Sequence, residues 1–126
     1  MKRPAILILD DDQDLAELVS WMLEGEGYEV RTAGNGIDGM RVLETFDPAL
    51  IILDMRMPLM DGWQFAAEIE ARGEHAPILV MTAAEDAHMP AKEIGAAHWI
   101  AKPFDVDALI ALVRAVVGPP PTPALA

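Results

Sequence analysis

The sequence predicts a doubly wound α/β domain, in which a five-stranded parallel sheet is covered by helices on both faces. Two observations lead to this prediction. Short continuous apolar runs, such as Ala5–Leu9 and Leu50–Leu53, recur along the chain, as expected of strands that are buried on both faces. The segments between them place apolar residues at helical spacing, so strands and helices alternate from end to end.

The first strand, Ala5–Leu9, is followed directly by three aspartates at positions 10–12. Apolar residues then recur at helical spacing over 13–25, with an aspartate at 12 or 14 as the N-cap and Gly25 at the end. The first strand therefore delivers carboxylates to the start of a helix, where the helix dipole favours negative charge.

A short strand is predicted over 28–33 and a second helix over 37–46, with its apolar face extending to Phe46. The third strand, Leu50–Leu53, ends on Asp54 and is followed by a loop rich in Pro and Gly. Asp54 is therefore delivered to the edge of the sheet where parallel folds place functional groups.

The second half of the chain continues the alternation. Its elements are predicted over 62–72 (helix), 77–82 (strand), 85–95 (helix), 97–101 (strand) and 106–117 (helix). Pro90 must lie in the first turn of its helix, and Asp105 or Asp107 caps the last helix. The domain is expected to span residues 1–118, and the Pro-rich residues 119–126 to form an extended tail or the start of a linker.

The composition of the chain excludes several classes of function. The 126 residues, 52% of them hydrophobic, suffice for one domain with a single core. A formal net charge of −12 without any Lys or Arg run argues against direct nucleic acid binding, and the lack of cysteine excludes thiolate chemistry. The first apolar run is too short for a signal peptide or a membrane span, so we expect a cytoplasmic domain with no membrane contact.

Polar side chains follow four of the five predicted strands. They are Asp10 with Asp11, then Asp54, Thr82 and Lys102. Because the carboxyl ends of parallel strands meet at one edge, these groups are expected to converge. Three carboxylates would repel one another unless a cation lies between them, and an all-oxygen ligand set suits Mg²⁺ better than zinc. A carboxylate beside a cation, an ammonium group and a hydroxyl group fits phosphoryl transfer to Asp54.

Four motifs in this order resemble the receiver domain of bacterial response regulators. They are LDD at 9–11, LDMRMPLMDG at 53–62, MTA at 81–83 and KPF at 102–104. The resemblance covers residues 4–118 and implies a flavodoxin-like fold with strand order 2-1-3-4-5. It also implies a phosphoacceptor in two-component signalling.

The resemblance implies a role for each site residue. A sensor histidine kinase or a histidine phosphotransfer protein would donate a phosphoryl group to Asp54. Mg²⁺ would be bound directly by Asp11, Asp54 and the backbone carbonyl of Arg56, and by Asp10 largely through water. The domain would catalyse only its own phosphorylation and dephosphorylation, so it would not be an enzyme with a separate substrate.

The resemblance also implies a switch. Lys102 would pair with a phosphoryl oxygen and precede a cis peptide bond to Pro103. Thr82 would move toward the phosphoryl group, and Trp99, where the family usually carries Tyr or Phe, would follow inward. The surface of the fourth helix, fifth strand and fifth helix would then change shape for a downstream protein or the chain's own output domain. Self-association through the apolar fifth helix, giving a homodimer, is a further hypothesis.

Two other readings compete with this one. A receiver-fold module could bind partners without phosphorylation, but it would not need the complete set of acids, Thr82 and Lys102. A phosphatase that forms an aspartyl phosphate would need a DxDxT motif after the first strand, where this chain has DDDQD. The three histidines lack the spacing of a metal site and are expected at the surface; they are His75, His88 and His98.

Overall fold

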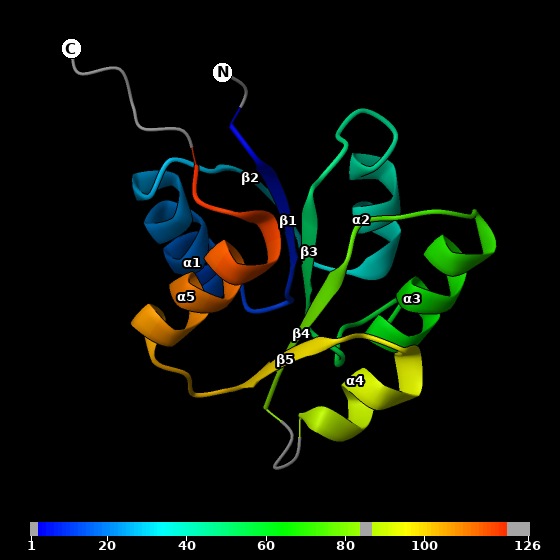
Figure 1. Ribbon diagram of the computed structural model, residues 1–126. Helices are drawn as coiled ribbons and strands as arrows, with labels where there is room; N and C mark the ends of the chain where they lie inside the picture. The colour runs from blue at the N-terminus through cyan, green and yellow to red at the C-terminus, as the bar shows by residue number, and fades with distance from the viewer. Residues whose placement is uncertain (1–2, 84–86, 121–126) are drawn as a thin grey trace.

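The computed structural model describes residues 3–83 and 87–120, over which strands and helices alternate strictly (Figure 1). The elements are β1 Ala5–Leu9, α1 Gln13–Gly25, β2 Glu29–Ala33, α2 Gly36–Val42, β3 Leu50–Leu53, α3 Gly62–Ala71, β4 Ile78–Thr82, α4 His88–Ile94, β5 His98–Ala101 and α5 Val106–Val117. No helix in these two stretches is long and apolar enough to cross a membrane.

The five strands form one parallel sheet in the order β2-β1-β3-β4-β5. Helices α1 and α5 cover one face, and α2, α3 and α4 cover the other (Figure 1). The predicted doubly wound fold and its strand order are confirmed. In the register of β1 and β3, Leu9 lies opposite Leu53, so the residues that follow them, Asp10 and Asp54, leave the sheet at the same level.

The central strand β3 explains why its sequence is apolar without interruption. All four of its side chains are buried, and they point alternately to opposite faces of the sheet. Leu50 and Ile52 pack in the cluster beneath α1 and α5, whereas Ile51 and Leu53 pack in the cluster beneath α2, α3 and α4. Each such side chain contributes about 1.5–3 kcal/mol on burial, so β3 anchors the position of Asp54.

Aspartates begin three of the helices. The Asp12 carboxylate accepts a hydrogen bond from the Leu15 backbone N–H at 3.1 Å, and the Asp105 carboxylate accepts one from the Asp107 N–H at 2.9 Å. Asp61 caps α3 in a capping box. Of the two alternatives at each of the first and last helices, Asp12 and Asp105 are therefore the caps.

Three predicted strand starts were wrong by one residue. The strands predicted from 28, 77 and 97 begin at Glu29, Ile78 and His98. Tyr28 instead closes the turn after α1: its backbone N–H donates to the Leu23 carbonyl, and its hydroxyl donates to the Gly118 carbonyl at 3.0 Å. These contacts tie the ends of α1 and α5 together.

The second helix is shorter than predicted. It ends at Val42, and Phe46 lies in the following loop, although its side chain is buried as expected. The Arg31 guanidinium lies 5.1 Å from the centre of the Phe46 ring, so a cation–π contact covers it. The fourth helix begins at His88 with Pro90 in its first turn, as predicted, whereas residues 85 and 86 of the predicted helix lie outside the described residues.

Candidate functional site

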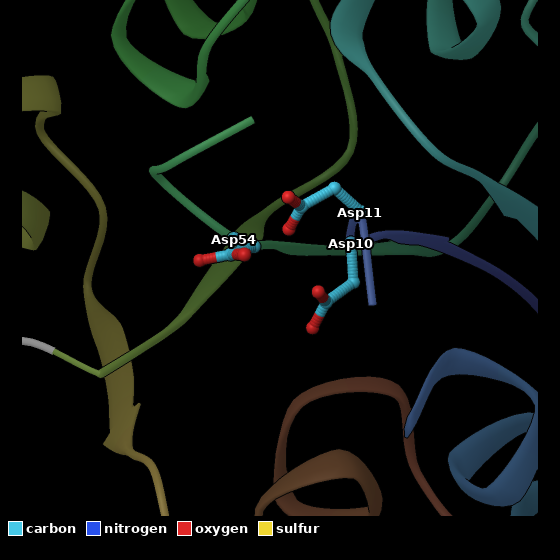
Figure 2. A group of neighbouring side chains, drawn as sticks. All are labelled: Asp10, Asp11 and Asp54. Carbon is cyan, nitrogen blue, oxygen red and sulfur yellow. The ribbon is translucent and has the colours of Figure 1, made fainter. Parts of the chain in front are cut away.

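The ends of β1 and β3 place three aspartates side by side (Figure 2). The Asp10 N–H donates to the Ala33 carbonyl at 3.0 Å, and the Asp54 N–H donates to the Leu9 carbonyl at 2.8 Å, so the sheet fixes both backbones. One carboxylate oxygen from each of Asp10, Asp11 and Asp54 lies within 4.8 Å of the others. Asp10 and Asp54 are buried, whereas Asp11 is exposed to solvent.

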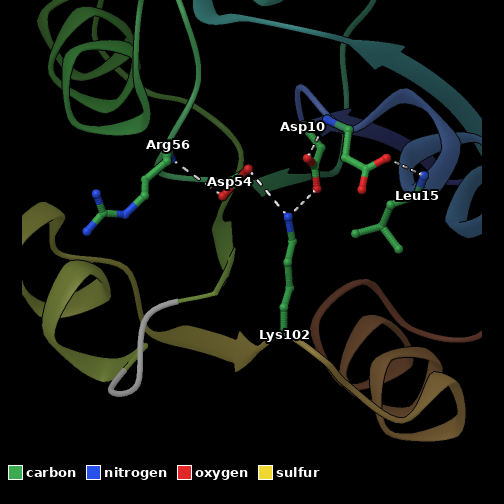
Figure 3. A network of polar contacts seen from close by, with 6 residues as sticks. Asp10, Leu15, Asp54, Arg56 and Lys102 are labelled. Atoms are coloured by element: carbon green, nitrogen blue, oxygen red, sulfur yellow. Dashed lines mark hydrogen bonds and ion pairs between the residues drawn. The ribbon is translucent and has the colours of Figure 1, made fainter.

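Lys102 supplies a positive charge to this cluster from the end of β5 (Figure 3). Its Nζ lies 2.7 Å from Asp10 Oδ2 and 3.4 Å from Asp54 Oδ2. The Lys102 backbone N–H donates to the Thr82 carbonyl at 2.8 Å, which ties the ends of β4 and β5 together. One ammonium group therefore pairs with two of the three carboxylates, and the site keeps an excess of negative charge.

Only one of the two carboxylate oxygens of Asp10 accepts a hydrogen bond. Its Oδ1 accepts a hydrogen bond from the Asp12 N–H at 2.9 Å. Its Oδ2 is buried and forms the ion pair with Lys102, but it has no hydrogen bond of good geometry. Buried carboxylate oxygens normally have such partners, so Oδ2 has capacity for a further ligand such as a metal-bound water.

The cluster changes the acidity of two of its members. Burial, and then the charge of Asp10, raise the pKa of Asp54 from 3.8 to about 6, against the opposing effects of Lys102 and the Arg56 N–H. Burial alone would lower the pKa of Lys102, but its contacts with Asp10 and Asp54 outweigh burial and raise it. Lys102 is therefore charged at neutral pH, and Asp54 is mostly ionised.

The remaining predicted site residues lie around this cluster. Thr82 is buried at the end of β4. The backbone nitrogen of Arg56 lies 3.5 Å from Asp54 Oδ1, and Arg56 is exposed to solvent. Trp99 lies on the outer surface, 42% exposed, with its ring centre 4.5 Å from that of His88. The structure thus brings the aspartates and Lys102 together, places Thr82 at the adjacent strand end, and leaves Trp99 on the outer surface.

Two features behind Asp54 were not expected from the sequence. Leu59 has a positive φ of 67° in a three-residue turn closed by the Met60 N–H and the Pro58 carbonyl, and its side chain is 77% exposed. A Cβ on Gly62 would lie 2.7 Å from Met55 Cα, so only glycine allows α3 to start this close to the strand. The glycine was visible in the sequence, but nothing there indicated that Leu59 occupies the left-handed region.

Two minor expectations can also be compared with the structure. The Lys102–Pro103 bond is cis, as the resemblance implied. His75 and His88 are exposed, as predicted, whereas His98 is half-buried at the start of β5. Among the described residues, the side chains grouped closely enough to hold a metal ion are Asp10, Asp11 and Asp54, and no histidine belongs to this group.

Comparisons with known proteins agree with this geometry. The family model for the response regulator receiver domain matches residues 6–114. The transcriptional regulatory protein PcoR of Escherichia coli is 35% identical over 114 residues, which cover 89% of this chain and 50% of PcoR. The regulator GlrR of Escherichia coli K12 is 40% identical over 111 residues, covering 85% of this chain and 25% of GlrR. This chain therefore spans half or less of the length of these relatives.

Solved structures show the same fold. The response regulator TrrA from Thermotoga maritima, in complex with Mg²⁺-BeF, has a TM-score of 0.80 and 31% identity, covering 90% of this chain and 98% of TrrA. The chemotaxis response regulator CheY4 of Vibrio cholerae has a TM-score of 0.81 and 28% identity, covering 91% of this chain and 99% of CheY4. The chain belongs to the family of response regulator receiver domains of two-component systems.

Proposed function

We propose that this domain is a phosphoacceptor in which Asp54 takes a phosphoryl group from a phosphohistidine of a partner protein. The donor is a sensor histidine kinase or a histidine phosphotransfer protein. The observation that most supports this is the convergence of three aspartates at the ends of β1 and β3, two of which pair with Lys102. Such a site offers one carboxylate as nucleophile and the other groups as charge stabilisers.

The reaction needs an ionised Asp54 that can reach phosphorus. A carboxylate oxygen of Asp54 forms a bond to phosphorus as the bond from phosphorus to the imidazole nitrogen breaks, and that nitrogen leaves with the bonding electrons. A pKa of about 6 keeps Asp54 mostly ionised at neutral pH while it stays buried. The Arg56 N–H, beside Asp54 Oδ1, helps to orient the carboxylate.

The residues present fit Mg²⁺. Asp10, Asp11 and Asp54, with the backbone carbonyl of Arg56, would hold the ion, Asp10 largely through water. Two observations support this assignment: the excess negative charge, and Asp10 Oδ2, which has no hydrogen bond beside its ion pair with Lys102. The related TrrA is described in complex with Mg²⁺-BeF. When bound, the ion supplies positive charge next to the phosphoryl oxygens.

Phosphorylation then moves the side chains of Lys102, Thr82 and Trp99. Lys102 moves its ammonium group from Asp10 toward a phosphoryl oxygen, and the Thr82 hydroxyl donates to another. Trp99 follows inward, and the surface formed by α4, β5 and α5 changes shape. That surface is the one read by a downstream protein or an output domain.

The partners follow from the same reading. The matched regulators are at least twice as long as the region they share with this chain, so an output domain of its own is one way to transmit the signal.

We assign residues 1–118 to the receiver and 119–126 to a tail or linker. We also place the domain in the cytoplasm and assign it no nucleic acid or membrane binding. Homodimerisation through α5 is a secondary hypothesis. The domain acts on itself and is not an enzyme with a separate substrate.

Chemical trapping tests the assignment of Asp54. The protein is incubated with acetyl phosphate and Mg²⁺ and reduced with borohydride, and the reduced residue is located by peptide mass spectrometry. Reduction at Asp54 supports the proposal. Reduction at Asp10, Asp11 or another acid would contradict it, and no reduction, together with no beryllofluoride binding, would favour the phosphorylation-independent binding module.

A further inference from the structure

The Trp99 indole is held on the outer surface by a ring from another element. Trp99 is the second residue of β5 and His88 is the first residue of α4, and Figure 1 shows these two elements next to each other. Their ring centres lie 4.5 Å apart with an interplanar angle of 43°. This is the distance and the tilted arrangement that favour contact between aromatic rings.

Trp99 and Thr82 lie on the same face of the sheet. Met81 and Ile100, their respective neighbours in sequence, pack in the cluster beneath α1 and α5. Because side chains alternate along a strand, Thr82 and Trp99 both point to the face covered by α4. A side chain that leaves the outer surface at Trp99 would therefore approach Thr82 without crossing the sheet.

Space between the two residues is occupied by a small side chain. In the register of β4 and β5, Thr82 lies opposite Ala101, and Trp99 lies opposite Val80, two residues earlier. The only β5 side chain on this face between Trp99 and the strand end is thus the methyl group of Ala101. The contact with His88 opposes inward movement more directly than any β5 side chain does.

The ring contact lies at the first turn of α4. Its N-cap, Ala87, makes no side-chain capping hydrogen bond, and the buried residues Ala87, Pro90 and Ala91 anchor this end of the helix to the core. The ring contact therefore links the start of α4 to β5. If Trp99 moves inward, this link between α4 and β5 breaks.

We propose that His88 is a positioning residue that holds Trp99 outward and so opposes activation at Asp54. This inference rests on the proposed function, because it concerns the switch that follows phosphorylation. Loss of an aromatic contact of this kind shifts an equilibrium by about two- to tenfold. His88 thereby sets how much of the protein is active at a given degree of occupancy of the site.

The test is a titration with beryllofluoride and Mg²⁺ that follows the indole N–H resonance of Trp99. The ¹⁵N-labelled protein contains three tryptophans, and Trp99→Phe identifies the resonance that belongs to Trp99. His88→Ala removes the ring, His88→Phe keeps an aromatic ring without the imidazole nitrogens, and His75→Ala removes another exposed histidine. Circular dichroism verifies that each variant is folded.

His88→Ala is expected to lower the beryllofluoride concentration at the midpoint by about two- to tenfold. His88→Phe and His75→Ala are expected to stay close to the wild-type midpoint. If His88→Ala leaves the midpoint unchanged while Trp99 still responds to beryllofluoride, the role of His88 is wrong and the proposed function stands. If His88→Phe behaves like His88→Ala, the ring contact is not the cause, which also overturns the role. No binding to the wild-type protein would overturn both.

Discussion

The ammonium nitrogen of Lys102 lies closer to Asp10, at 2.7 Å, than to the proposed phosphoacceptor Asp54, at 3.4 Å. The Asp10 side chain is fully buried and that of Lys102 is 17% exposed, so solvent screens their attraction only in part. Without a phosphoryl group, Lys102 thus mainly neutralises a neighbouring acid. This arrangement has consequences for stability as well as for chemistry.

Removal of the lysine charge should destabilise the metal-free protein. Lys102→Met keeps most of the side-chain volume but leaves Asp10 and Asp54 without a positive partner. We expect the free energy of unfolding to fall by about 2–4 kcal/mol, measured by urea denaturation in EDTA. Lys92→Met, at an exposed position of α4, is the matched control and should change stability little. Equal effects of the two substitutions would show that the buried ion pair is not important for stability.

Asp54 should destabilise the metal-free protein in a pH-dependent way. Its pKa is about 6 in the folded protein against 3.8 ordinarily, so the folded state binds the proton more tightly than the unfolded state. Stability from this group is therefore greatest at low pH and falls as pH rises from about 4 to 6. Asp54→Asn should raise the free energy of unfolding at pH 7 by about 1–3 kcal/mol.

The pH profile distinguishes this cause from a general effect of substitution. The advantage of Asp54→Asn in EDTA should shrink as pH falls from 6 toward 4. Asp47→Asn, at an exposed site, should show no such trend. An advantage for Asp54→Asn that is constant between pH 4 and 7 would contradict the raised pKa.

Magnesium should reverse the repulsion among the carboxylates. Added Mg²⁺ is expected to raise the melting temperature at pH 7, and this gain should disappear as pH falls below about 6 because protons compete for Asp54. Asp11→Asn should weaken Mg²⁺ binding about tenfold or more, since even groups that only orient ligands contribute 10- to 100-fold. Calorimetric titration measures this, and unchanged affinity would remove Asp11 from the site.

The backbone conformation of Leu59 should lower the free energy of unfolding. A left-handed conformation costs a residue with a Cβ about 1–2 kcal/mol, and glycine escapes this cost but loses more chain entropy on folding. Leu59→Gly should therefore raise the free energy of unfolding by about 0.5–1 kcal/mol. Leu59→Ala, which keeps the Cβ, should give no gain; if it stabilises as much as glycine, the leucine side chain and not the backbone is responsible.

The sequence predicted those features that follow from local pattern. The continuous apolar run of β3 indicated a strand buried on both faces, and the polar residues that follow the strands indicated a common edge. Both inferences depend only on side-chain alternation and on parallel pairing. The order of the strands, by contrast, came from the resemblance to a known family.

Features that depend on tertiary packing were not predictable in the same way. No local pattern indicates that Lys102 lies closer to Asp10 than to Asp54, because that choice depends on how two strand ends and a side chain fit together. The contact of Trp99 with a ring from α4 was likewise not predictable, because no local pattern shows which residue of the preceding helix lies against β5. The end of α2 at Val42 was missed because Phe46 continues the helical spacing of the apolar residues before it, although its side chain is buried from a loop.

The measurement that tests the central claim most directly is the intact mass of the protein after incubation with acetyl phosphate. It is made with Mg²⁺ and with EDTA, on the wild type and on Asp54→Ala, with Asp47→Ala as a matched control. We predict one phosphoryl group on the wild type and on Asp47→Ala in Mg²⁺, and none in EDTA or on Asp54→Ala. An adduct that persists in Asp54→Ala, or that forms equally well in EDTA, would contradict phosphoryl transfer to Asp54 at a magnesium site.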